Sequence, residues 1–134
     1  MKENETRTIL IVDDDPDFLF QLELILKSAG NRVIKAETGK EAGVLLRRHR
    51  PDALIADLML EEEDGGFVLA HLAKKLYPGL PVIIVTGVAG ETGIEFAAVT
   101  REERSWIKAD LLLDKPVRPE QILAELERLL GNGE

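Results

Sequence analysis

Five short apolar segments alternate along this chain with amphipathic segments, and this alternation restricts the fold more than any other feature. The apolar segments, of which 8–12 and 80–87 are rich in β-branched residues, are typical of strands buried on both faces of a sheet. They predict strands over 8–12, 32–36, 52–56, 80–87 and 110–114. The amphipathic segments predict helices over 17–30, 38–50, 66–77, part of 91–108, and 119–131.

The repeated strand–helix order predicts a single α/β domain with a doubly wound (βα)5 fold. We expect a five-stranded parallel sheet in the order 2-1-3-4-5, with helices on both faces. The 134 residues suffice for one core and are too few for two ordinary domains. The core is expected over about 8–131, with 1–6 and 132–134 as frayed ends.

Several residues mark where the helices begin and end. Asp15 is predicted as the N-cap of the first helix, because Pro16 then occupies the first helical position. Gly30 is predicted just past the end of the same helix. Thr38 and Glu41 have the S/T-x-x-E spacing of a capping box, which predicts the start of the second helix.

Charge and composition argue against several classes of function. Acidic residues outnumber Lys and Arg by 25 to 17, and the net charge of −8 argues against direct nucleic-acid binding and against docking on an anionic membrane. The chain has no cysteine, so no disulfide and no zinc–thiolate site is expected. With a polar N-terminus and no apolar run long enough to span a membrane, we expect a cytoplasmic protein.

Polar side chains follow the predicted strands at the sheet edge where open α/β folds bind ligands. Asp13 and Asp14 follow the first strand, and Asp57 follows the third. Thr86 lies at the end of the fourth strand and Lys115 follows the fifth. Crowded carboxylates recruit a cation, and an all-oxygen acidic site suits a magnesium ion (Mg²⁺). Together with a hydroxyl and an ammonium group, these carboxylates fit phosphoryl transfer to an aspartate nucleophile.

The segments ILIVDDDPDF, VIIVTG and LLDKPV, together with Asp57 at its strand end, resemble a response-regulator receiver domain of two-component signalling. The resemblance spans about residues 8–131 and implies a flavodoxin-like fold. It implies that Asp57 accepts a phosphoryl group from a phosphohistidine on a sensor histidine kinase or phosphotransfer protein. The chain would then be a phosphoprotein switch in signal transduction, not an enzyme acting on an external substrate.

The same resemblance implies a role for each residue of the site. The implied Mg²⁺ ligands are Asp13, Asp14, Asp57 and the backbone carbonyl of Met59. Thr86 would hydrogen-bond the phosphoryl group and follow it, and Lys115 would contact a phosphoryl oxygen. The Lys115–Pro116 bond would be cis, a state that only about 5–6% of X-Pro bonds adopt.

The sequence also departs from the family pattern. Leu112 occupies the signalling position, which is usually aromatic, so the switch is expected to be weaker or to run through the backbone. Thr86 and Lys115 are 115 − 86 = 29 positions apart, longer than the family pattern by roughly two helical turns of about 3.6 residues. The extra length lies within 88–109, the usual partner-binding face. Glutamates 61–63 either form a solvated acidic turn or help attract Mg²⁺.

Two further functions compete with the phosphoacceptor switch. One is a receiver-like interaction module that does not switch. The other is a Mg²⁺-dependent aspartyl phosphatase, for which Asp13-x-Asp15 fits superficially. Nothing after residue 131 could form a DNA-binding motif, so we expect action through an unknown downstream protein, or a domain cut from a longer regulator. The leucines of 122–130 are expected to face the core or to bury a stripe in a homodimer, and the basic residues 47–50 to form a solvated helix end.

Overall fold

The chain forms a five-stranded parallel sheet with strand order β2-β1-β3-β4-β5. The strands are β1 (Thr8–Val12), β2 (Arg32–Ala36), β3 (Ala53–Asp57), β4 (Val82–Thr86) and β5 (Leu111–Asp114). The structure is a computed structural model, and it describes residues 6–58, 60, 65–86, 109–114 and 117–130. The predicted α/β fold and the predicted strand order are both confirmed.

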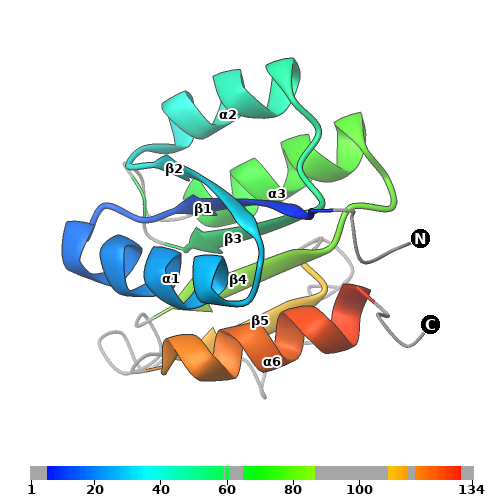
Figure 1. The fold of residues 1–134 in the computed structure, drawn as a ribbon. Coiled ribbons are helices and arrows are strands. Elements are labelled where there is room, and N and C mark those ends of the chain that lie inside the picture. The colour runs from blue at the N-terminus through cyan, green and yellow to red at the C-terminus, as the bar shows by residue number, and fades with distance from the viewer. Residues whose placement is uncertain (1–5, 59, 61–64, 87–108, 115–116, 131–134) are drawn as a thin grey trace.

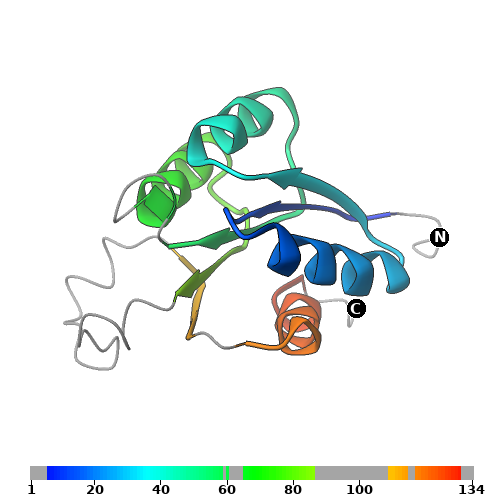
Figure 2. The same ribbon diagram turned by 90° about the vertical axis from the view of Figure 1, so that its left-hand side faces the viewer.

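Helices cover both faces of the sheet (Figures 1 and 2). The helices are α1 (Pro16–Ser28), α2 (Gly39–Arg48), α3 (Gly65–Leu76) and α6 (Pro119–Leu130). Helices α1 and α6 lie on one face, and α2 and α3 lie on the other. Within the described residues, none of these helices has the length and apolarity that crossing a membrane requires. The helix expected within 91–108 lies outside the described residues and stays a prediction.

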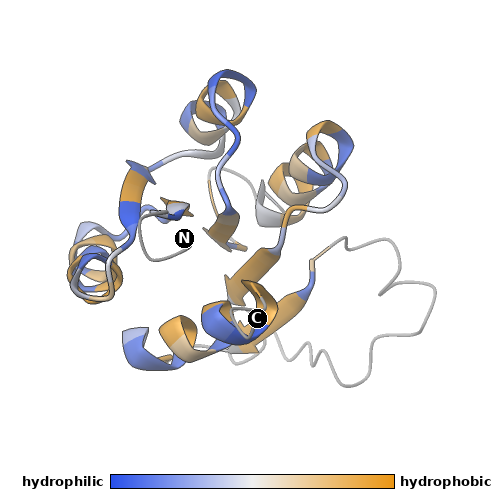
Figure 3. Cartoon of the chain, turned by 45° about the vertical axis from the view of Figure 1, so that its right-hand side comes forward, coloured by the Kyte–Doolittle hydropathy of each residue, from blue (hydrophilic) through white to orange (hydrophobic). Residues whose placement is uncertain are grey.

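The core consists of two apolar layers, one on each side of the sheet. Along β1, Ile9 and Ile11 pack against α1 and α6, whereas Leu10 and Val12 pack against α2 and α3. The side chains of β3 and β4 are also divided between the two layers, and every residue of these two strands is buried. Figure 3 shows these central strands hydrophobic along their length and the helices mixed in character. Burial on both faces explains why the strands read as continuous apolar runs.

Both ends of α1 follow from local sequence signals. The Asp15 carboxylate accepts hydrogen bonds from two backbone N–H groups of the first turn, which confirms it as the N-cap. At the other end, Gly30 has a positive φ of 91°. Its N–H donates to the carbonyl of Lys27, and the N–H of Asn31 donates to the carbonyl of Leu26. This pair of bonds is the Schellman motif, which favours glycine at this position.

Helix α2 begins as predicted and ends earlier. The Thr38 hydroxyl accepts a hydrogen bond from the Glu41 N–H at 3.0 Å, and the Glu41 carboxylate accepts one from the Glu37 N–H at 3.1 Å. The predicted end at residue 50 is wrong, because His49 is already extended (φ −139°, ψ 133°). The next residue precedes Pro51, whose ring disfavours helical backbone at the position before it.

Three strands also differ from their predicted bounds. Strand β5 begins at Leu111 and not at residue 110, and β3 begins at Ala53 and not at residue 52. Asp57 is the last residue of β3 rather than the residue after it, because β3 continues to pair with β4 through Asp57 and Val85. Strand β4 begins at Val82 and not at residue 80. The N–H of Leu80 donates to the carbonyl of Tyr77 in a turn, and Pro81 has no N–H to offer.

Candidate metal centre

Three carboxylates meet at the carboxyl ends of β1 and β3. Oxygen atoms of Asp13, Asp14 and Asp57 all lie within 4.8 Å of one another. Strand β1 pairs with β3 so that Val12 faces Ala56, and the next residue of each strand is therefore an aspartate at the same edge. Asp13 and Asp57 are only 2% and 6% exposed, whereas Asp14 is exposed. The structure thus brings together three of the residues predicted as metal ligands.

Backbone hydrogen bonds hold Asp13 in position. Its N–H donates to the carbonyl of Ala36 at the end of β2, over 3.1 Å. Its carboxylate Oδ1 accepts a hydrogen bond from the N–H of Asp15 at 2.9 Å. Asp15 in turn caps α1, so a series of hydrogen bonds links the end of β2, Asp13 and the start of α1.

The start of α3 contacts the backbone around Asp57. The N–H of Gly66 donates to the carbonyl of Leu58 at 2.8 Å, and the N–H of Leu58 donates to the carbonyl of Val85 at 2.9 Å. A Cβ on Gly66 would lie 2.5 Å from the Asp57 carbonyl oxygen and 2.7 Å from the Leu58 Cα. Only glycine fits this approach. The positioning role of Gly66 was not predicted from the sequence, although a glycine pair directly after an acidic loop was a usable signal.

Thr86 lies at the same edge of the sheet. It is the last residue of β4 and is fully buried. Because Asp57 pairs with Val85, Thr86 lies one residue beyond Asp57 along the strands. Thr86 also pairs with Asp114 of β5. The predicted site residue Lys115 lies outside the described residues, together with Met59, Pro116 and glutamates 61–63, and its role stays a prediction.

Leu112, at the position that is usually aromatic in receivers, belongs to β5 and pairs with Ile84. Its side chain is partly buried and packs against the apolar layer on the α2 and α3 side. A leucine in this place is therefore part of the packed sheet, with less side-chain surface to move than an aromatic ring.

The donor set fits a hard divalent cation. Oxygen-only carboxylate sites suit Mg²⁺, which binds through one or two carboxylates and keeps several waters. Grouping the carboxylates of Asp13, Asp14 and Asp57 is electrostatically costly unless positive charge is close by. The carboxylate cluster of Asp13, Asp14 and Asp57 therefore has the chemistry to hold a divalent cation.

Comparison with known proteins identifies relatives along most of the chain. The family model of the response regulator receiver domain matches residues 9–127. The chain is 32% identical to the protein PilH of Pseudomonas aeruginosa over 127 residues, which covers 92% of this chain and 97% of PilH. It is 45% identical over 78 residues to the transcriptional regulatory protein GlrR of Escherichia coli, which covers 58% of this chain and 17% of GlrR. The chain spans less than half the length of GlrR and of a receiver protein from Anaeromyxobacter.

Solved structures give the same relationship at the level of the fold. A CheY-like receiver domain from Methanospirillum hungatei superposes with a TM-score of 0.78 at 28% identity, covering 96% of each chain. A putative response regulator from Chloroflexus aurantiacus gives a TM-score of 0.77 at 31% identity, covering 94% of this chain and 98% of the other.

Proposed function

This chain belongs to the response regulator receiver domain family, and from that premise we propose that it is a phosphoacceptor switch of a two-component phosphorelay. Asp57 accepts a phosphoryl group from a partner histidine kinase or phosphotransfer protein in a Mg²⁺-dependent reaction. The observation that carries the proposal is the cluster of Asp13, Asp14 and Asp57 at the carboxyl ends of adjacent strands. Receiver domains are signalling domains, and we do not assign this one turnover of an external substrate.

The three carboxylates share one task in this proposal. Asp13, Asp14 and Asp57 would hold Mg²⁺, together with the backbone carbonyl of Met59. The bound cation would neutralise charge on the phosphoryl oxygens. The hydrogen bond from the Asp15 N–H holds the Asp13 carboxylate in place at the end of β1.

The transfer step is a displacement at phosphorus. A carboxylate oxygen of Asp57 forms a bond to phosphorus while the P–N bond of the donor phosphohistidine breaks, and the electron pair stays on the imidazole nitrogen. The Thr86 hydroxyl donates a hydrogen bond to one phosphoryl oxygen, and the Lys115 ammonium contacts another. Asp57 and Thr86 are both buried and end adjacent strands, so both lie at the edge of the sheet where the phosphoryl group would bind.

The change that signals phosphorylation to a downstream protein starts at the same edge of the sheet. Thr86 moves toward the phosphoryl group, and this movement changes the surface formed by 86–112, which a downstream protein then reads. Because Leu112 replaces the usual aromatic residue and packs against the core, we propose that the change passes through the backbone of β4 and β5. The chain acts in the cytoplasm, through protein contacts and without direct nucleic-acid binding.

The proposal is tested by incubating the chain with Mg²⁺ and acetyl phosphate and measuring its intact mass. We expect a mass gain of one phosphate that EDTA abolishes and that Asp57→Asn abolishes. Asp17→Asn is the matched control, because Asp17 lies in the first turn of α1 outside the carboxylate cluster. No adduct on the unmutated chain, or an adduct that persists in Asp57→Asn, would contradict the assignment.

The second candidate is a receiver-like interaction module that does not switch, and Leu112 is the observation that favours it. Amide exchange across 86–110 with and without beryllofluoride, a phosphoryl mimic, separates the two functions. The switch predicts changed protection, and unchanged protection would support the module. The aspartyl phosphatase finds no support in the geometry, because the Asp15 carboxylate is used to cap α1.

A further inference from the structure

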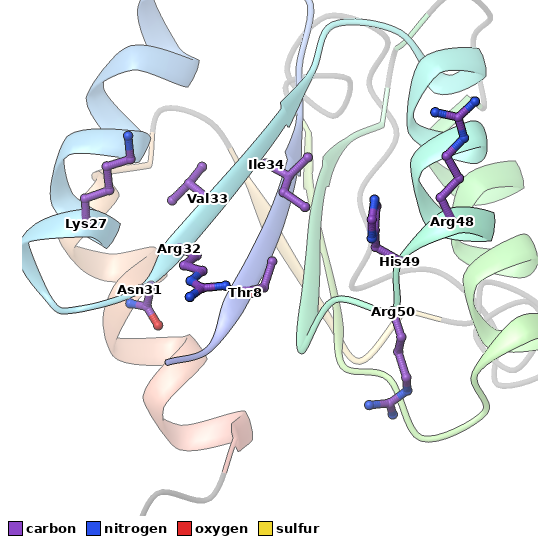
Figure 4. Close-up of a pocket in the computed structure, with 9 residues that line it drawn as sticks. All are labelled: Thr8, Lys27, Asn31, Arg32, Val33, Ile34, Arg48, His49 and Arg50. Atoms are coloured by element: carbon purple, nitrogen blue, oxygen red, sulfur yellow. The ribbon is translucent and has the colours of Figure 1, made fainter. Parts of the chain in front are cut away.

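A groove lies at the amino-terminal ends of β1 and β2, at the opposite end of these strands from the carboxylate cluster (Figure 4). Its volume is about 850 Å³. We call it the basic edge groove, and its lining residues are Thr8, Lys27, Asn31, Arg32, Val33, Ile34, Arg48, His49 and Arg50. They come from the starts of two strands and from the ends of α1 and α2.

The groove concentrates positive charge in an acidic protein. Four of the 17 Lys and Arg residues line it, and its described lining includes no acidic residue, in a chain of net charge −8. Arg32 and Arg48 are exposed and form no ion pair within the described residues. A solvated end of α2 accounts for Arg48, as predicted from the sequence, and Lys27 in the last turn of α1 forms an ion pair with Glu23 at 2.8 Å. Neither accounts for the exposed Arg32 on β2, which lines the same groove, and this placement calls for another explanation.

Strand β2 is an edge strand, and no strand among the described residues pairs with its outer side, beside the groove. The N–H of Arg32 donates to the carbonyl of Arg7 at 2.7 Å, and the carbonyl of Ala36 accepts from the Asp13 N–H at 3.1 Å. Residues 32, 34 and 36 therefore turn their peptide groups toward β1. Because peptide groups alternate along a strand, Val33 and Lys35 turn theirs to the open edge. This edge offers hydrogen bonds that another extended backbone would match.

The cationic groups are spread along the groove and do not converge on one point. In Figure 4, Arg48 and Arg50 point in opposite directions from the end of α2, and Lys27 lies across β2 from both. The Arg50 guanidinium lies over the Tyr77 ring, 5.5 Å from its centroid, and this contact helps to hold the Arg50 side chain in place. A compact anion would meet only one or two of these groups, whereas an extended polyanion would meet several.

We propose that the basic edge groove binds an acidic, extended segment of a partner protein, which adds as a strand to the free edge of β2. The backbone of the segment pairs with Val33 and Lys35, and its carboxylates face Arg32 and Arg48. A nucleic acid would satisfy the charge, but its backbone has no N–H donors to match the outward carbonyls. The free backbone groups of the edge therefore favour a peptide.

The test measures binding of a fluorescein-labelled peptide of about nine residues with alternating Glu and Val, by fluorescence anisotropy with the full chain. We expect saturable binding that weakens with salt. The double variant Arg32→Glu, Arg48→Glu should weaken it at least about tenfold, because like charges then face each other. Lys75→Glu, Arg118→Glu is the control with the same change in net charge, at exposed positions outside the groove, and it should keep most of the affinity.

Two further measurements test strand addition itself. A peptide with alternate N-methylated residues loses backbone donors and should bind at least about tenfold more weakly. Amide exchange at Val33 and Lys35 should slow when the unmethylated peptide binds. Equal binding of the methylated peptide, equal binding of an oligothymidylate, or no saturable binding would overturn the proposal. Self-association that is lost in Arg32→Glu, Arg48→Glu would overturn it too, by making a second copy the occupant.

The two variant arginines lie outside the proposed phosphorylation site, so phosphorylation of Asp57 should be unchanged in the double variant. Loss of peptide binding with phosphorylation intact would therefore concern the basic edge groove alone.

Discussion

The backbone of Gly66 lies so close to Asp57 that a Cβ at position 66 would be 2.5 Å from the Asp57 carbonyl oxygen. The first turn of α3 therefore touches the strand end that carries the proposed phosphoacceptor. The contact involves backbone atoms on one side, which cannot rotate away as a flexible side chain can. The start of α3 thus helps to set the position of Asp57.

Gly66→Ala is expected to destabilise the protein by about 1–3 kcal/mol, because the strand end or the helix must shift to admit the methyl group. Gly79→Ala is the matched control, since a Cβ there meets nothing within 4 Å, and it is expected to be neutral or stabilising by up to about 1 kcal/mol. Urea unfolding measures both. Equal stability of the two variants would show that the approach at Gly66 relaxes without cost.

Mg²⁺ is expected to raise the midpoint of thermal unfolding, because a ligand that binds only the folded chain stabilises it, by about 2.7 kcal/mol at 100 times its Kd. Asp13→Asn should shift this effect to at least about tenfold higher Mg²⁺, since loss of even an outer-shell partner costs about 10–100-fold in metal affinity. Asp15→Asn is the matched control, because it removes the same charge and keeps a good N-cap, and it should respond to Mg²⁺ like the unmutated chain. If both variants respond to Mg²⁺ like the unmutated chain, Asp13 is not a ligand.

Asp110, directly before β5, links this strand to α3 and to the start of β4. Its carboxylate accepts hydrogen bonds from the Lys74 ammonium at 2.8 Å and from the Val82 N–H at 2.7 Å. Asp110→Ala leaves the N–H of the buried Val82 without this acceptor, and we expect a loss of about 1–3 kcal/mol in the free energy of unfolding. Glu125→Ala breaks an exposed ion pair with Arg128 and should cost less than about 1 kcal/mol. A larger cost for Glu125→Ala would contradict this ranking.

The pKa of Glu23 is lowered from 4.5, mainly by hydrogen bonds from Lys27 and then from Lys35. A carboxylate with a lowered pKa in the folded state stabilises the protein above its unfolded pKa, and the contribution is lost as the pH falls through the folded value. Stability should therefore fall more between about pH 5 and pH 3 in the unmutated chain than in Glu23→Gln. Urea unfolding at several pH values measures this small difference, and parallel pH profiles would contradict it.

Most of the fold could be predicted from the sequence because its signals are local. Apolar runs and helical spacing each determine the structure of the segment in which they occur. Asp15 and Gly30 likewise set the two ends of α1 through contacts with residues a few positions away. Given the expected strand order 2-1-3-4-5, the meeting of Asp13 with Asp57 followed from the general rule that ligand sites lie at the carboxyl ends of parallel strands.

The features that were not predicted depend on contacts between distant segments. The pairing that extends β3 through Asp57 requires β4 beside it in the sheet. The close approach of Gly66 to Asp57 and the bond between Lys74 and Asp110 arise only when α3 packs on the sheet. The basic edge groove was also missed, because Arg32 and Arg48 come together only once β2 becomes an edge strand. Local propensity carries no information about such contacts.

The most direct test of the central claim is to locate the phosphoryl group by chemical trapping. The chain is phosphorylated with Mg²⁺ and acetyl phosphate and then treated with borohydride, which reduces an aspartyl phosphate to homoserine. Tandem mass spectrometry of the peptide that spans Ala53–Leu58 then identifies the modified residue. Homoserine at position 57 and at no other aspartate is the predicted result. Homoserine at position 13 or 14, or none at all, would contradict the account.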